Sequence, residues 1–301
     1  MPVKKHVTGA LLSAATTGFK AVFQAAFKAV EPVWKKIAEE VNSNTSIETY
    51  EWLGAIPGMR EWIGERVINR LEENAYMLKN KKFEGTIAVS RDAVSDNQLG
   101  TYSLAFKGLG EGAAQHPDEL VFQALKEGAI KPCFDGQNFF DTDHPVMVAG
   151  EEASVSNFED GAGPAWYLLC TTKAVNPIIY QNREDPELIS QDDPKTSHHT
   201  FMQDEFLYGA RTRGVAGYTY WQLAFMSKQP LTAANFAAAR AAMATLKDDH
   251  GKSLGIVANL LVVPPQLEGD ADEIVSVKRT TGGKDNVHYG KAEIMMTPWL
   301  S

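Results

Sequence analysis

Residues 133–145 bring together the side chains of this sequence that are most capable of chemistry. A thiol, three carboxylates and an imidazole follow one another closely there, at Cys133, Asp135, Asp141, Asp143 and His144. Carboxylates with a histidine can ligate a divalent metal, and a cysteine paired with a histidine can act as a nucleophile. The stretch therefore raises two hypotheses, a metal-dependent hydrolase and a cysteine nucleophile.

The spacing of these residues supports neither hypothesis. A calcium loop needs oxygen ligands at alternating positions, a central glycine and a terminal glutamate, and the stretch does not provide that pattern. The sequence contains no HExxH pair of histidines for zinc. Asp and Asn side chains in such a segment more often cap the turns of their own backbone. We therefore expect a structural loop, with no catalytic residue, no metal ligand and no cofactor.

Three further groups of residues have a simple structural explanation. Residues 108–112 are rich in glycine but lack the Lys-Ser/Thr of a phosphate-binding loop. The pair His198-His199 lies in a polar stretch, where exposed histidines are commoner than metal ligands. The remaining group consists of aromatic residues that we expect in the core or at a subunit interface, and not as a stacking platform: Tyr208, Tyr218, Tyr220, Trp221 and Phe225.

The composition indicates a packed globular protein with an acidic surface. The 301 residues are 44% hydrophobic, and 38 acidic against 29 basic residues give a formal net charge of -9. This charge disfavours non-specific nucleic-acid binding, although an acidic wall would let an enclosed duplex slide. The two cysteines are too few for a disulfide scaffold, and no run of 18 apolar residues could span a membrane. We expect a reducing cytosol and no membrane association.

An amphipathic stripe lies between residues 19 and 41. Its apolar residues follow steps of four and three, as one face of a helix requires: Phe19, Phe23, Phe27, Val30, Trp34, Ile37 and Val41. Pro32 lacks an amide hydrogen, so it should kink this helix or open a second one. The spacing therefore predicts a helix, a proline and another helix. The apolar face can pack on the chain's own core or on a neighbouring molecule.

The remaining chain mixes helical and strand patterns. Helices are predicted over 59–71, from Ser95 or Asp96 towards Gln115 with a restart at Pro117, and over 233–246 behind the capping residue Thr232. Strands are predicted over 83–89, 167–170, 178–180, 260–263 and 291–296, with more between 206 and 225. The fold class indicated is α+β.

Several blocks of the sequence resemble the major head subunit family of Mu-like prophages. They follow one another along the chain at residues 50–54, 59–64, 116–121, 135–145, 166–169, 177–181, 255–265 and 297–300. The resemblance thus extends over residues 50–300 and does not depend on one short motif. The phenylalanine-rich stretch before residue 42 carries the least of it.

This resemblance implies the Hong Kong 97-type phage capsid fold. In that fold, residues 1–48 would be an N-terminal arm, and residues 49–90 an extended loop and its approach. Residues 91–130 would hold the spine helix of a peripheral domain, with the helix itself over 99–127. Residues 131–301 would build the axial domain and the remaining peripheral strands, because both domains are discontinuous in the sequence.

The same resemblance implies a major capsid protein, not an enzyme. Copies would assemble through hexamers and pentamers into an icosahedral shell that encloses phage DNA without reading its sequence. Assembly would take place in the cytoplasm of the bacterial host, and the product would be the capsid of the virion. Scaffold, portal and decoration proteins would be further partners. One chain that fills both kinds of ring needs large, near-equivalent interfaces.

Contacts between subunits are expected from six aromatic residues of the arm and the extended loop. An extended arm that cannot bury its own apolar face gains by lying across a neighbour. The candidates are Phe19, Phe23, Phe27, Trp34, Trp52 and Trp62.

Three rival functions remain open at this point. A cellular nanocompartment shell with the same fold would enclose an enzyme instead of DNA. A hydrolase that uses Asp141, Asp143 or His144 would bind a metal or turn over a substrate. A tail or adaptor protein would form a ring or a tube and not a closed shell.

Overall fold

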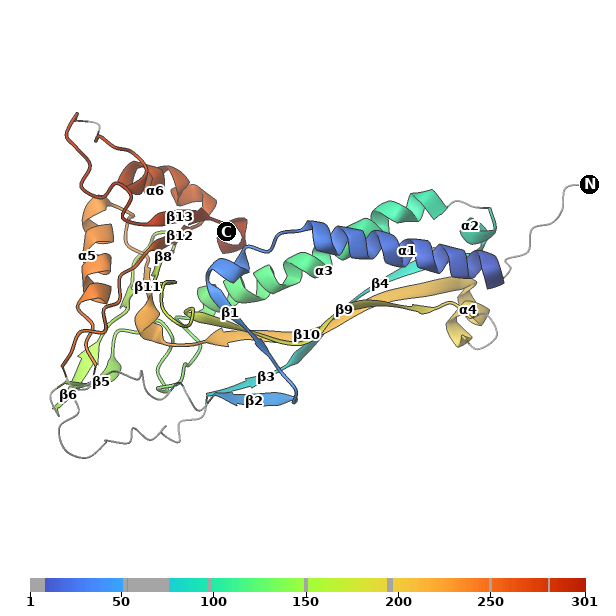
Figure 1. Cartoon of the computed structure of the whole chain (residues 1–301), viewed down its shortest axis with the longest axis horizontal. Helices are drawn as coiled ribbons and strands as arrows, with labels where there is room; N and C mark the ends of the chain where they lie inside the picture. Colours follow the sequence, from blue (N-terminus) through green and yellow to red (C-terminus); the bar gives the residue numbers. More distant parts are fainter. Residues whose placement is uncertain are drawn as a thin grey trace, which may run out of the picture.

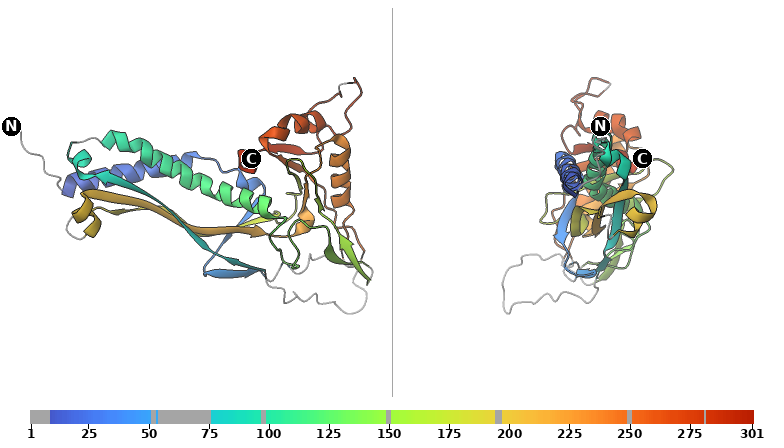
Figure 2. Two further views of the ribbon diagram at one scale, coloured as in Figure 1. Left: turned by 180° about the vertical axis from the view of Figure 1, so that it is seen from behind. Right: turned by 90° about the vertical axis from the view of Figure 1, so that its right-hand side faces the viewer.

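The computed structural model describes residues 9–50, 53, 76–96, 99–148, 151–193, 197–248, 251–280 and 282–301. The molecule is elongated and has two unlike halves (Figure 1). In one half, two long helices lie over a narrow sheet of long strands. The other half holds a second sheet flanked by shorter helices, and the C-terminus lies near the junction of the halves. The views from behind and from the end agree with this arrangement (Figure 2).

The sheet of the first half has the strand order β1-β9-β10-β4. Strands β9 (Ile178–Gln191) and β10 (Glu205–Tyr218) pair antiparallel, and β4 (Lys81–Ser90) pairs antiparallel with β10. Buried and less buried side chains alternate along most of β10, so one face of the sheet meets a core. Strand β4 confirms the alternation predicted over 83–89.

Helices α1 (Gly9–Ala29) and α3 (Leu99–Glu127) lie on the same side of this sheet (Figure 1). Helix α3 confirms the helix expected over 99–127. It continues through four glycines and Pro117, because tertiary packing stabilises it beyond its own propensity. The core beneath the two helices consists of Leu12, Ala15, Phe19, Phe23, Val89, Val94, Phe106, Leu188, Phe206, Tyr208 and Ala210.

Gly110 allows α3 to approach α1 closely. A Cβ atom at residue 110 would lie 2.5 Å from the carbonyl oxygen of Phe23 and 3.0 Å from the Cβ of Ala26. Real Cβ atoms do not come so close to backbone oxygen, so a larger residue would separate the helices. Gly112 belongs to the same helix, but a Cβ atom there would have nothing within 4 Å.

These two glycines give a matched pair of predictions. Gly110→Ala should destabilise the subunit by about 1–3 kcal/mol, because the added methyl group overpacks the contact between the helices. Gly112→Ala should stabilise it by about 0.5–1 kcal/mol, because alanine loses less backbone entropy in a helix. Urea denaturation of dissociated subunits measures both changes. Equal stabilisation by the two substitutions would show that α1 and α3 are not in this contact.

The prediction of a second helix after Pro32 is wrong. Helix α1 ends at Ala29, a 3₁₀ turn η1 (Trp34–Lys36) follows, and the chain then enters strand β1 (Ala38–Asn42). Strand β1 pairs parallel with β9. That hydrogen-bonding partner comes from a distant part of the chain, so the local helical spacing of the apolar residues did not reveal it.

The second half is built around a sheet with the order β13-β12-β8-β11-β7. Every residue of β8 (Trp166–Leu169), β11 (Ala224–Ser227) and β12 (Leu260–Val263) is buried, as expected for strands covered on both faces. The edge strands are β7 (Phe158–Glu159) and β13 (Glu293–Met296). Strand β12 confirms the strand predicted over 260–263.

Helices α5 (Ala233–Ala244) and α6 (Glu268–Val275) flank this sheet (Figure 1). The hydroxyl of Thr232 accepts a hydrogen bond from the backbone N–H of Asn235, which confirms the predicted cap and the start of α5.

The remaining described elements are short. They are the pairs β2 (Ile47–Tyr50) with β3 (Tyr76–Lys79) and β5 (His144–Val148) with β6 (Glu151–Val155), the helices α2 (Arg91–Ser95) and α4 (His198–Gln203), and the turns η3 (Trp221–Leu223), η4 (Pro265–Leu267) and η5 (Pro298–Leu300). The helix predicted over 59–71 lies outside the described residues. No helix in the described ranges has the length and apolar character needed to cross a bilayer.

Candidate functional site

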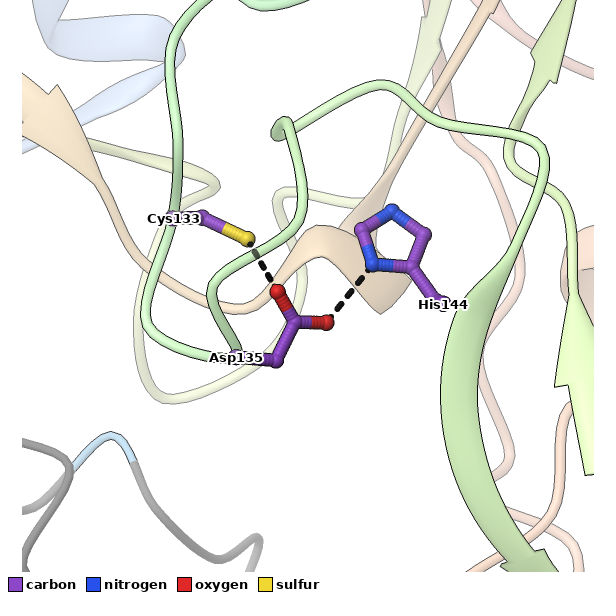
Figure 3. Close-up of side chains that lie close together, drawn as sticks. All are labelled: Cys133, Asp135 and His144. Atoms are coloured by element: carbon purple, nitrogen blue, oxygen red, sulfur yellow. Dashed lines mark hydrogen bonds and ion pairs between the residues drawn. The ribbon is translucent and has the colours of Figure 1, made fainter. Parts of the chain in front are cut away.

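Part of the polar stretch 133–145 forms a buried cluster in the segment between α3 and β5. A tight turn at Asp135-Gly136 folds the segment back, with Gly136 at a φ of 86° that favours glycine. The N–H of Cys133 donates to the carbonyl of Gln137 at 2.8 Å and closes this turn. As a result the side chains of Cys133, Asp135 and His144 point toward one another (Figure 3).

His144 is the centre of the cluster. Its side chain has no exposed surface, its Nδ1 lies 2.7 Å from Oδ2 of Asp135, and its Nε2 lies 3.2 Å from Oδ1 of Asn157. Its ring stacks on Trp221 of η3, with 4.0 Å between centroids and 9° between planes. The imidazole therefore connects the loop after α3 to the segment after β6 and to η3.

Asn157 determines where hydrogens must lie in this cluster. Its Nδ2 donates to the carbonyl oxygens of Phe139, Trp221 and Ala224, at 2.8, 3.3 and 3.3 Å. Since carbonyl oxygens only accept, Oδ1 is the atom that faces His144, and Nε2 must donate to it. The contact between Nδ1 and the Asp135 carboxylate needs a hydrogen as well.

The Asp135 carboxyl is held in its ionised form. Burial opposes ionisation, but hydrogen bonds from His144 and Cys133, the charge of His144 and the N–H of Gln137 outweigh it. Together they hold the pKa of Asp135 below its ordinary value. The sequence hypothesis of an Asp that caps its own turn is confirmed for the Gln137 contact, but it missed the ion pair with His144.

Cys133, Asp135 and His144 are also a set of donors that could by type hold a metal ion, with ligand atoms within 4.8 Å of one another. Two ligands of a tetrahedral zinc stay about 3.3 Å or more apart, given the usual metal–ligand distances. The Nδ1–Oδ2 distance of 2.7 Å and the Sγ–Oδ1 distance of 3.0 Å are shorter than that. These are hydrogen-bond distances, so the described arrangement fits shared protons better than a shared metal.

The thiol of Cys133 is a poor nucleophile in this environment. It is 5% exposed and donates a hydrogen bond to Asp135. Burial and the neighbouring negative charge raise its pKa well above the ordinary range, so the reactive thiolate is disfavoured. The arrangement therefore serves to position the loop and not to activate sulfur.

Asp141 and Asp143 do not converge on His144 as the metal hypothesis required. Asp141 accepts hydrogen bonds from the N–H groups of Thr142 and Asn138, which outweigh desolvation and lower the pKa of its carboxyl. A hydrogen bond with Asp141 raises the pKa of the exposed Asp143. Asp143 thus lies at the surface and Asp141 is half-buried, while His144 is turned inward.

The ion pair predicts a pH dependence. Because the folded-state pKa of Asp135 is lowered, its stabilising contribution is complete above the ordinary carboxyl pKa of about 3.9 and disappears as the pH falls through the folded-state value. Urea denaturation at several pH values should therefore show wild-type stability falling more steeply below pH about 4 than the stability of Asp135→Asn. Parallel profiles would show that Asp135 titrates alike in both states.

The aromatic stripe packs on the subunit's own core. Phe19, Phe23 and Trp34 are 4%, 0% and 3% exposed. Phe19 stacks on Phe106 of α3 with 4.1 Å between ring centroids, and Trp34 packs against Tyr180 of β9 at 4.8 Å. The expectation that these three residues contact a neighbour is therefore wrong, because α3 and the long sheet already cover them.

The other expected contact residues have different outcomes. Phe27 is half-buried and lies parallel to Phe23 with 6.3 Å between centroids. Trp52 and Trp62 lie outside the described residues. The sequence analysis placed five aromatic residues between 208 and 225 either in the core or at a subunit interface. All five are buried in the core: Tyr208, Tyr218, Tyr220, Trp221 and Phe225.

Several large apolar side chains are instead exposed elsewhere on the molecule. Leu104, Ile130, Phe201, Met202 and Val287 are between 59% and 81% exposed. Exposed apolar groups of this size mark surfaces that bind other macromolecules when they gather in patches. Sequence periodicity did not identify them: Leu104 lies on α3, and the other four lie in short or irregular segments.

Comparison with known proteins agrees with the resemblance along the whole chain. The family of the Mu-like prophage major head subunit gpT matches residues 12–300. The major capsid protein of Escherichia phage Mu is 39% identical over 307 residues, which cover 98% of this chain and 99% of that protein. The Mu-like prophage FluMu major head subunit of Haemophilus influenzae is 37% identical over 281 residues, which cover 90% of both.

Solved structures of an assembled phage head are similar to this chain as well. The procapsid of bacteriophage JBD30 superposes with a TM-score of 0.86 and 42% identity, covering 97% of this chain and 100% of that one. The JBD30 capsid superposes with a TM-score of 0.79 and 33% identity, covering 98% and 99%. The chain thus has the Hong Kong 97-type fold of phage shells, and it belongs to the Mu-like prophage major head subunit family, whose members are major capsid proteins.

Proposed function

We propose that copies of this chain assemble through hexamers and pentamers into an icosahedral shell that encloses phage DNA. The proposal rests above all on the near-complete overlap with a procapsid subunit, at a TM-score of 0.86. An elongated subunit with several exposed apolar side chains also suits a protein that buries much of its surface against neighbours. Assembly would take place in the cytoplasm of the bacterial host.

The parts of the subunit would divide this task as follows. Helix α3 would be the spine helix within residues 91–130, and α1 within the arm 1–48 would lie back on its own subunit. Residues 49–90 would form the extended loop and its approach, and residues 131–301 the axial domain with the remaining peripheral strands. Phe27, Trp52 and Trp62 would remain candidates for contact with a neighbour.

Further proteins would complete the particle. The JBD30 capsid has been solved decorated with minor capsid protein trimers, and that subunit superposes on this chain with a TM-score of 0.75. We extend this to the present chain and propose decoration, scaffold and portal proteins as partners. The net charge of -9 would keep the enclosed DNA from adhering to the wall.

The shell function would need no catalytic step. The protonated Cys133 and the paired Asp135 and His144 would act as structural groups that hold the loop after α3. A hydrolase, the rival function, would need one of these groups free to bind a metal or to react with a substrate.

Electron microscopy of the expressed full chain, alone and together with its neighbouring head-assembly proteins, tests the proposal. We expect closed icosahedral particles, and nucleic acid inside them when packaging proteins are supplied. Open tubes or single rings under all conditions would contradict a shell, and a particle that encloses an enzyme would favour a nanocompartment.

A further inference from the structure

The loop 276–292, which follows α6 and is described over 276–280 and 282–292, is a basic projection on an acidic protein. It contains four basic side chains and one acidic one, Lys278, Arg279, Lys284, Lys291 and Asp285, for a formal charge of +3. Every one of these five residues is exposed. Figure 1 shows the loop extending beyond α6 at the end of the molecule farthest from the N-terminus. Such a concentration of positive charge is notable in a chain whose net charge is -9.

Hydrogen bonds hold the base of this loop in place. The Nδ2 of Asn286 donates to the carbonyl oxygens of Ile274 and Val277, both at 2.8 Å. The N–H of Gly290 donates to the carbonyl of Val275, also at 2.8 Å. These bonds fix the base of the loop at the end of α6, and a fixed base lowers the entropy cost of binding.

Apolar side chains lie among the charges of the loop. Val287 is 75% exposed, Tyr289 46% and Val277 41%, and the ammonium of Lys278 lies 5.6 Å from the Tyr289 ring centroid. Tyrosine and arginine are enriched in protein–protein contacts, and the loop presents one of each, Tyr289 and Arg279.

Helix α6 offers the complementary charge. Its eight residues contain four acidic side chains and no basic one: Glu268, Asp270, Asp272 and Glu273. All four are exposed. The positive end of the helix dipole accounts for acids in the first turn, at Glu268 and Asp270, but not for the two that follow.

Within one subunit, most charged side chains of α6 form no ion pair with the basic loop, as far as the described residues show. In the part of the chain that the structure describes, no ion pair joins Glu268, Asp270 or Asp272 to a cation of the loop. Among the described residues of the loop, the one ion pair connects Arg279 and Asp285 at 3.7 Å. Lys278 and Lys284 thus have no carboxylate partner among the described residues, although Lys278 lies over the Tyr289 ring.

We propose that the loop 276–292 of one subunit docks on α6 of the next subunit in the same ring. The contact is heterologous, since each copy presents a basic surface to one neighbour and an acidic surface to the other, which is the pattern that closes a ring. This inference rests on the proposed assembly into hexamers and pentamers. It commits to a second copy because the complementary acidic surface belongs to the same chain.

Three charge-reversal variants of the full chain test this docking. The loop variant carries Lys278→Glu with Lys284→Glu, and the helix variant carries Asp270→Lys with Asp272→Lys. The control for the loop variant, Lys20→Glu with Lys28→Glu, makes the same change in charge as that variant on exposed residues of α1. Each is expressed with the head-assembly proteins, and shell yield is measured by sedimentation and electron microscopy.

We expect the loop and helix variants each to lower shell yield by about tenfold or more, because they place like charges against each other. The control should remain near wild type. Co-expression of the loop and helix variants should restore rings, since each reversed loop then meets a reversed helix on its neighbour. Rings of six can alternate the two variants fully, whereas rings of five keep one mismatched contact, so hexamers should recover further than pentamers.

Several outcomes would overturn the inference while leaving the shell intact. One is a normal shell yield from both the loop variant and the helix variant. Another is that these variants form shells normally and lose only the binding of decoration proteins. If shell yield recovers only when the loop and helix changes are combined in one chain, and not on co-expression, the loop pairs with α6 of its own subunit. If a reversed variant fails to melt cooperatively, Lys278→Gln with Lys284→Gln replaces it, and an unchanged yield from this folded variant counts against docking. If the wild type forms no particles, the proposed function fails instead.

Discussion

Replacing Phe23 by alanine should destabilise the subunit by about 3–5 kcal/mol. The ring is fully buried between α1, α3 and the long sheet, and its removal leaves a cavity that the neighbouring rigid elements cannot fill. Such a loss is a large part of the total stability of about 5–15 kcal/mol that folded domains have. Urea denaturation of dissociated subunits, followed by circular dichroism, measures it.

Phe27→Ala is the matched control for this prediction. Phe27 lies one turn further along the same helix and is only half-buried. We expect Phe27→Ala to lower the free energy of unfolding by much less than Phe23→Ala does. If Phe27 contacts a neighbouring subunit, its loss should instead lower the assembly yield. If Phe23→Ala leaves the melt unchanged but abolishes shells, α1 must leave its own subunit and dock on a neighbour.

Asp135→Ala should cost a similar amount, about 3–5 kcal/mol near neutral pH. It removes the charge partner of the fully buried His144 and also leaves the Cys133 thiol and the Gln137 N–H without their acceptor. Buried polar groups without a partner lose their hydration and gain no hydrogen bond in return. Removing one partner therefore costs more stability than the intact pair contributes.

Asp143→Ala provides the comparison for Asp135→Ala. Asp143 lies eight residues further along the same segment, but its side chain is exposed and faces Asp141. Its loss should change the free energy of unfolding by no more than about 0.5 kcal/mol. Equal effects of the two substitutions would mean that His144 is not paired with Asp135 inside the protein.

Local sequence patterns were sufficient to predict two kinds of element: those stabilised by contacts close in the sequence, and those that are fully buried. The capped helix α5, the apolar strand β12 and the alternating strand β4 lie close to their expected positions. In each case a side-chain cap, a continuous apolar run or a period of two reflects the environment of that element alone.

Elements that depend on distant partners were not predicted correctly. Residues 37–41 have helical spacing, yet they form β1 because β9 supplies a parallel partner. The stripe at Phe19 and Phe23 correctly indicated one buried face, but periodicity does not say which surface covers it. Gly110 carries part of the answer, since its missing Cβ allows α3 to cover that face.

The buried cluster was predicted only in part for the same reason. The density of polar residues around Asp135 and His144 was visible, and a structural loop was the correct interpretation of the Gln137 contact. The roles of Asn157 and Trp221 could not be inferred, because both are brought to His144 by the packing of β6, β7 and η3. Nothing in their own surroundings in the sequence marks them.

Sedimentation velocity of the purified full chain, with scaffold protein supplied, tests the central claim most directly. A head subunit that covers its exposed apolar side chains with neighbouring copies should sediment as capsomers and as larger closed particles, with proportions that depend on concentration. A single species of 33.0 kDa, independent of concentration under these conditions, would contradict the assignment as a shell-forming subunit.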